Sequence, residues 1–223
     1  GAIGTAHLLK LSGVGAEEVR RPAGLSVLAR LPVGMHCVDH PEWVLPVSWS
    51  PTHDLPPLEA VLTTPDGIEI RPYTAGFGAM ISGRRDDPAD QSHIGVALMQ
   101  PRSRGRVRLA SADPAVPPII EHRYDSEPKD VAALRAGAEL TRELAAATAE
   151  VGTASWSTSQ HLSGTAPMGA DDDPAAVLDP RCRVRGVDGL WVVDGSILPM
   201  ITGRGPHATI VMIGHRAVEF ISG

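Results

Sequence analysis

Residues 60–73 read AVLTTPDGIEIRPY, and this stretch decides the fold class. Its middle, Pro65-Asp66-Gly67, holds the residue types that favour a tight turn. The six residues that follow, up to Tyr73, alternate between apolar and polar side chains, and two extended runs joined by a short turn predict a β-hairpin. Similar stretches at 93–99 and 106–109 predict further strands, so we expect an antiparallel sheet.

Helical patterns accompany these strands. Residues 127–150 carry apolar side chains at spacings of three and four, with Ser126 placed to cap the start and Gly152 placed to end the helix. Pro206 opens a last helix. We expect its buried stripe to consist of Ile210, Ile213, Ala217 and Ile221.

The first residues predict a short helix that buries Leu8, Leu9 and Leu11 and ends near Gly13. A core-quality helix at residue 1 indicates that the chain is part of something longer. The apolar run at 190–193 predicts a short strand. Together these elements predict an α+β fold, with flanking helices on an antiparallel sheet.

Composition excludes several classes of protein. The chain has 223 residues, 20 basic against 26 acidic side chains and a net charge of −6, which excludes a sequence-wide nucleic-acid footprint. No window approaches the roughly 18 apolar residues of a membrane span. Two cysteines cannot form a disulfide framework. We therefore expect a cytoplasmic protein, with peripheral attachment to a membrane left open.

Two short motifs suggest sites that we do not assign. Residues 203–208, GRGPHA, match the dinucleotide fingerprint, but no strand runs directly into them and Pro206 removes one phosphate-binding N–H. What remains is a helix start with free N–H groups at 207–209, which is an anion site. Residues 36–40, HCVDH, hold possible metal ligands without a second cluster, so we expect a structural turn and no metal.

Two further segments could carry chemistry. Residues 161–169, HLSGTAPMG, form a glycine-punctuated loop with one imidazole, and residues 186–196, GVDGLWVVDGS, run from a turn into a polar strand end. A lone histidine is more often a hydrogen-bonded structural residue than a catalytic one. Taken singly, neither segment decides a function.

Taken together and in order, these segments resemble the glucose-methanol-choline (GMC) family of flavoprotein oxidoreductases, of choline-dehydrogenase type. The similarity covers nearly the whole chain. It is carried by residues 1–15, 32–41, 104–124, 161–169, 192–196 and 206–213.

The resemblance implies a division of the chain into three segments. Residues 1–32 would belong to the FAD domain, 33–160 would form the substrate-binding domain, and 161–223 would carry the active-site histidines and return to the FAD domain. It also implies that the Rossmann-type part of the FAD domain precedes this chain. The 223 residues alone would then be inactive.

The resemblance implies FAD-dependent oxidation of an alcohol to a carbonyl, with hydride transfer to flavin N5. His161 would be the catalytic base and His207 its partner. An aromatic residue commonly precedes this base in the family, whereas Gln160 does here. The residues that would contact FAD are Asp194, Gly195, His207, Ala208 and Thr209.

Alternatives stay open at this point. The electron acceptor that regenerates the flavin could be oxygen, a quinone or a redox partner, and the substrate is a small-molecule alcohol of unspecified identity. A hydroxynitrile-lyase-like member would keep FAD without redox turnover. The isolated chain could also be a substrate-binding or interaction module with no activity.

Overall fold

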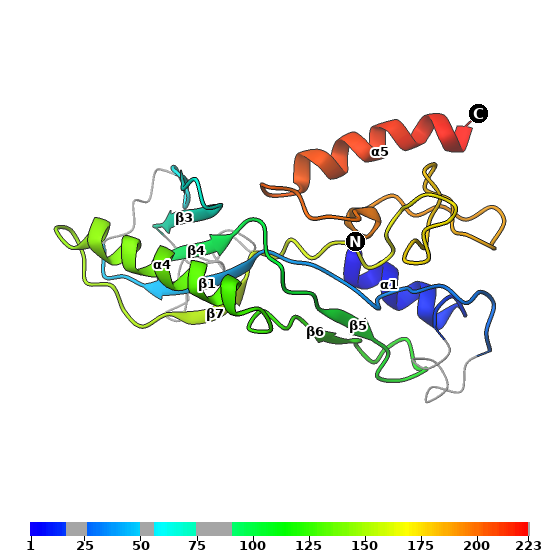
Figure 1. Ribbon diagram of the computed structural model, residues 1–223, viewed down its shortest axis with the longest axis horizontal. Coiled ribbons are helices and arrows are strands. Elements are labelled where there is room, and N and C mark those ends of the chain that lie inside the picture. The colour runs from blue at the N-terminus through cyan, green and yellow to red at the C-terminus, as the bar shows by residue number, and fades with distance from the viewer. Residues whose placement is uncertain (17–25, 50–55, 75–90, 223) are drawn as a thin grey trace. The chain divides into compact units, whose positions relative to one another are not determined.

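A five-stranded antiparallel sheet organises one of the two compact units into which the chain divides (Figure 1). The structure is a computed structural model that describes residues 1–16, 26–49, 56–74 and 91–222. The sheet unit consists of His40–Arg102 and Glu127–Ser159. Its strands, in the spatial order β2-β3-β4-β1-β7, are Leu62–Thr63, Ile68–Tyr73, His93–Leu98, Pro41–Pro46 and Ser155–Thr158.

The hairpin predicted for residues 60–73 is confirmed. β2 and β3 pair antiparallel, with Leu62 opposite Ile70, and Gly67 in the turn has a positive φ of 79° that a side chain would strain. The strand predicted at 93–99 is β4, which pairs antiparallel with both β3 and β1. The fold class is therefore the mixed one expected, with an antiparallel sheet and helices.

Helix α4 (Pro128–Ala145) covers one face of this sheet (Figure 1). Gly137 lets the helix approach closely, since a Cβ there would lie 2.7 Å from Val96 Cγ1. The helix is shorter than the predicted 127–150 and its N-cap is Glu127, so the prediction of Ser126 as the cap was wrong. Pro128 itself provides the start, because its fixed φ suits the first turn.

The opposite face of the sheet is buried and polar. Side chains alternate along a strand, so the residues between the apolar ones that meet α4 point to the other face. There Glu42 on β1 and Glu69 on β3 flank Ala97 of β4, and in the next row Gly95 lies opposite Arg71. A Cβ on Gly95 would lie 2.0 Å from Glu42 Oε1, so the missing side chain makes room for that carboxylate.

The second unit joins Gly1–Asp39, Ser103–Ser126 and Gln160–Gly223. Its regular elements are α1 (Ala2–Leu11), the hairpin of β5 (Arg106–Arg108) and β6 (Ile119–Glu121), the 3-10 helix η2 (Gly195–Ile197) and α5 (His207–Ser222). The three segments assigned above by function are not these units, because 33–39 and 103–126 belong to the unit that contains α1 and α5. Their assignment to FAD or substrate stays a prediction.

Three local predictions in this unit were wrong. Residues 190–193 form no strand but only one bridge, between Arg183 and Trp191. Leu8 is 65% exposed, because α1 turns the face of Ala2, Ala6 and Leu9 to the core. On α5 only Ala217 of the predicted stripe is buried among the described residues, and Ile221 is exposed.

Lys10 is fully buried at the inner side of α1, where its ammonium donates to the carbonyl of Val107. Burial, reinforced by the positive charge of Arg108, lowers the pKa of Lys10 to about 8. Cys37 shares this core, and burial together with the charge of Asp39 raises the pKa of its thiol to about 12. Folding therefore disfavours the charged form of both groups.

Replacing Lys10 with methionine should raise the free energy of unfolding at pH 7 by about 1–2 kcal/mol. A pKa lowered from 10.5 to about 8 means that the charged Lys10 destabilises the folded state by about 3 kcal/mol below pH 8. The substitution also removes the hydrogen bond to Val107, which reduces the gain in stability by about 1 kcal/mol. The stability gain should shrink as pH rises from 8 to 10.5, because in that range the unfolded wild type binds more protons than the folded one and its free energy of unfolding therefore rises with pH. Denaturant unfolding against pH measures this.

The matched control is Lys129→Met at the exposed start of α4, the other lysine of the chain. It should change stability little and without this pH dependence. The titration of Cys37 is common to wild type and variant, so it largely cancels in the difference. A Lys10→Met protein less stable than wild type across the whole pH range would contradict the account.

Candidate active site

The two loops that the sequence singled out lie side by side. Gly164 donates its N–H to the carbonyl of Gly195 (3.1 Å), and Ala166 and Met168 continue the pattern to Ser196 and Ile197 (2.9 Å each). The glycine at 164 has a positive φ of 75°, so the chain turns there at little cost. The loop that begins at His161 is thus tied to η2 along its length.

Asp194 is the anchor at the start of η2. Its Oδ1 accepts the N–H of Ser196 at 2.7 Å, as an N-cap does, and its Oδ2 accepts the hydroxyl of Thr5 at 2.5 Å. Both carboxylate oxygens are therefore used within the protein. Asp194 can contribute to a ligand site mainly by fixing the backbone at Gly195.

The start of α5 lies against the same segment. A Cβ on Gly195 would lie 3.2 Å from Ile210 Cδ1, so η2 and the first turn of α5 are in contact. The first hydrogen bond of the helix runs from Ile210 N–H to the carbonyl of Pro206. The N–H groups of His207, Ala208 and Thr209 consequently have no acceptor inside the helix, and their partial positive charge favours an anionic or carbonyl group.

The imidazole of His161 lies beside the chain that leads into α5. A methyl group added to Gly205 would be 3.4 Å from His161 Nε2, and Gly205 precedes His207 by two residues. His161 is half-buried, whereas His207 is exposed at the helix start. Histidines 46 positions apart in the chain are therefore held in one neighbourhood, with the predicted residues 194, 195, 208 and 209 close by.

The donor set suits a polar, electron-rich ligand. Ser196 is fully buried and its Oγ has no hydrogen-bond partner among the described residues. An unpaired buried hydroxyl costs free energy, so such an atom marks a place where a ligand or water completes the bonding. Independently of Ser196, the N–H groups at the start of α5 suit the carbonyl and ring nitrogen groups of a flavin.

A family model described as GMC oxidoreductase matches residues 101–214. The chain belongs to the GMC oxidoreductases. An uncharacterised GMC-type oxidoreductase of Rhodococcus erythropolis is 44% identical over the whole chain and 48% of its own length. Choline oxidase of Arthrobacter globiformis is 32% identical over 99% of this chain and 47% of its own length. The chain spans about half the length of these relatives.

A solved structure shares the fold of the chain. Pyridoxine 4-oxidase from Mesorbium loti superposes on the whole chain with a TM-score of 0.80 at 25% identity, and the match covers 49% of that protein. GMC oxidoreductases are FAD-dependent flavoproteins, so FAD is the cofactor that the family implies. The GMC resemblance stated from the sequence and the choice of FAD are both confirmed.

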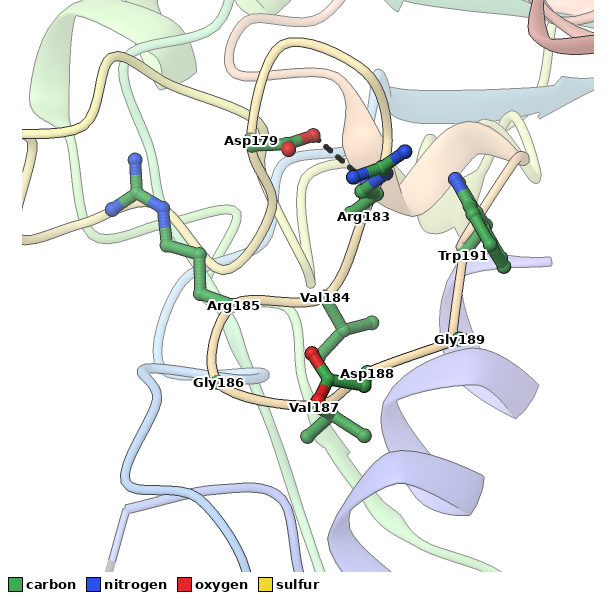
Figure 2. A pocket seen from close by; sticks show the side chains of 9 residues that line it. All are labelled: Asp179, Arg183, Val184, Arg185, Gly186, Val187, Asp188, Gly189 and Trp191. Carbon is green, nitrogen blue, oxygen red and sulfur yellow. Dashed lines mark hydrogen bonds between the residues drawn. The ribbon is translucent and has the colours of Figure 1, made fainter. Parts of the chain in front are cut away.

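A separate hollow of about 360 Å³ lies in the 179–191 hairpin, and none of the predicted site residues lines it (Figure 2). Arg183 stacks over Trp191 there, with its guanidinium carbon 5.6 Å from the ring centroid. Two acidic residues, Asp179 and Asp188, balance Arg183 and Arg185. Arg185 already donates to backbone carbonyls such as that of Asp173, so its guanidinium is held by the protein itself.

The segment 36–40, weighed above as a metal site, has another role. In the described parts of the chain no three histidine, cysteine or acidic side chains converge as metal ligands. Asp39 instead accepts the backbone N–H of His161. The sequence assigned no function to Asp39 because nothing in the pattern of residues 36–40 points to a residue so distant in the chain.

None of the helices in the described ranges combines the length and the apolar content that crossing a membrane requires.

Proposed function

We propose that the protein oxidises a small-molecule alcohol to a carbonyl compound with FAD as the electron acceptor. The observation that carries the proposal is the approach of His161 Nε2 to Gly205, next to the start of α5. A base and a hydrogen-bond donor in one neighbourhood are what removal of a hydroxyl proton needs.

His161 is the base in this proposal. A neutral imidazole accepts the hydroxyl proton at a pH near neutrality, because its ordinary pKa is close to that pH. His207 orients the same oxygen and stabilises the negative charge that develops on it. FAD, when bound, supplies the acceptor for the hydride that leaves the carbinol carbon.

The cofactor contacts follow from the same neighbourhood. The N–H groups of His207, Ala208 and Thr209 would hold the electron-rich edge of the flavin, and the positive end of α5 would stabilise its reduced, anionic form by up to about 1–2 kcal/mol. Asp194 and Gly195 would present backbone groups to the ribityl and diphosphate region. Residues within 33–160 would bind the substrate.

The natural electron acceptor and the cellular location stay predictions. Oxygen, a quinone or a redox partner would each complete the cycle, and the composition favours a cytoplasmic protein. None of these choices alters the roles given to the two histidines.

Anaerobic mixing of the FAD-loaded holoenzyme with a panel of alcohols tests the proposal. Choline, pyridoxine and simple aliphatic and aromatic alcohols form a first panel. We expect at least one alcohol to bleach the visible flavin absorbance without oxygen, with the matching aldehyde or ketone formed in equal amount. A flavin that stays oxidised with every alcohol, while a cyanohydrin is cleaved, would replace the proposal with the lyase alternative.

A further inference from the structure

Asp39 is a buried carboxylate with both oxygens committed. Its side chain is 1% exposed. Oδ1 accepts the backbone N–H of His161 at 2.9 Å, and Oδ2 accepts the hydroxyl of Tyr124 at 2.6 Å. Both distances lie in the normal hydrogen-bond range, and the two bonds together fix the carboxylate between residues 124 and 161.

The backbone at His161 depends on such attachments. Gln160, immediately before it, has a positive φ of 60°, a conformation that costs a residue with a side chain about 1 kcal/mol or more. The carbonyl of His161 accepts the hydroxyl of Ser163 at 2.8 Å. Both polar groups of the His161 peptide are therefore held, and Asp39 holds the one next to the strained residue.

Tyr124 in turn is held in place. Its ring stacks on that of His122, with 4.7 Å between centroids. His122 Nδ1 is 3.8 Å from Asp39 Oδ2, which is beyond hydrogen-bond distance. Of these two neighbours, Tyr124 and not His122 donates a hydrogen bond to Asp39 Oδ2.

We propose that Asp39, supported by Tyr124, is a positioning residue that fixes the backbone from which the His161 imidazole projects. The inference rests on the proposed function for its catalytic consequence. Asp39 does not itself act as a base, because both oxygens are occupied and buried. A displacement of about 1 Å in a catalytic group can cost on the order of 10²-fold in rate, so a device of this kind matters to the reaction.

The test compares Asp39→Leu, Asp39→Asn and Tyr124→Phe in the holoenzyme, with Asp188→Asn as the control. Asp188 lies exposed in the same unit, so its replacement removes one negative charge without touching this network. Three quantities are measured: hydrogen exchange of the His161 amide, the limiting rate of flavin reduction, and the KM for the alcohol.

In Asp39→Leu we expect the His161 amide to exchange on the order of 100-fold faster, and the limiting rate to fall by roughly 10–100-fold with little change in KM. Asp39→Asn keeps an oxygen that can accept this N–H. It should therefore recover most of the amide protection and most of the limiting rate. Tyr124→Phe should give an amide exchange rate and a limiting rate between those of Asp39→Leu and Asp39→Asn. Asp188→Asn should match wild type.

Unchanged His161 amide exchange in a folded Asp39→Leu protein overturns the inference. If Asp39→Leu does not fold, unchanged exchange and rate in Tyr124→Phe overturn it instead. Faster amide exchange in Asp39→Leu, combined with normal flavin reduction in His161→Ala, has a different meaning. The positioning role then stands, and the catalytic role of His161 fails.

Discussion

Replacing His161 with alanine in the FAD-loaded holoenzyme should slow flavin reduction by the alcohol by roughly 10²–10⁴-fold. That range is the usual loss when a general base is removed. The expected effect is on the limiting rate, because the imidazole acts on the hydroxyl proton in the transition state and contributes little to binding the alcohol. Stopped-flow mixing without oxygen measures flavin reduction directly and separates it from reoxidation.

The control is His215→Ala, which removes an exposed histidine from the second half of α5. It should reduce flavin at the wild-type rate. Added imidazole should restore part of the rate in His161→Ala, since a small base can occupy the space that the side chain leaves. Near-normal reduction in His161→Ala would remove His161 from the catalytic role and leave His207 as the candidate base.

The parts of the fold set by local sequence were predictable. The hairpin at β2 and β3 follows from a turn sequence and strict alternation, both of which act over a few residues. The segment 190–193 has the same apolar character but pairs through a single bridge, between Trp191 and Arg183, so apolar character alone did not specify a strand there. Leu8 shows the same limit, because periodicity gives a helical face but not the surface on which it packs.

In the candidate site, the sequence predicted the functional side chains but not the residues that hold them in place. His161 and His207 were predicted from the resemblance to the GMC family, which rests on the order of short motifs along the chain. Asp39 and His161 are 122 residues apart, and only the folded backbone brings this carboxylate to that N–H. Thr5, which donates to Asp194, was missed for the same reason.

The other large effect concerns the buried polar face of the sheet. Arg71 donates to Glu69 Oε2 (2.8 Å), to Glu42 Oε2 (3.0 Å) and to Ser159 Oγ (3.0 Å). Burial acts to lower the pKa of Arg71, but the Glu42 carboxylate and the hydrogen bond to Glu69 outweigh burial and raise that pKa. One guanidinium thus pairs with two carboxylates inside the unit.

Arg71→Met should therefore lower the free energy of unfolding by about 3–5 kcal/mol, because it leaves Glu42 and Glu69 buried without their cation. Arg108→Met is the matched control, since the Arg108–Glu121 pair is partly exposed and such pairs are worth about 0–1 kcal/mol. Denaturant unfolding of both variants gives the comparison. Adding Glu42→Gln and Glu69→Gln to Arg71→Met should recover much of the loss, because neutral amides are less costly to bury than unpaired carboxylates. Equal destabilisation by the Arg71 and Arg108 variants would show that burial of the charges is not what makes Arg71 important.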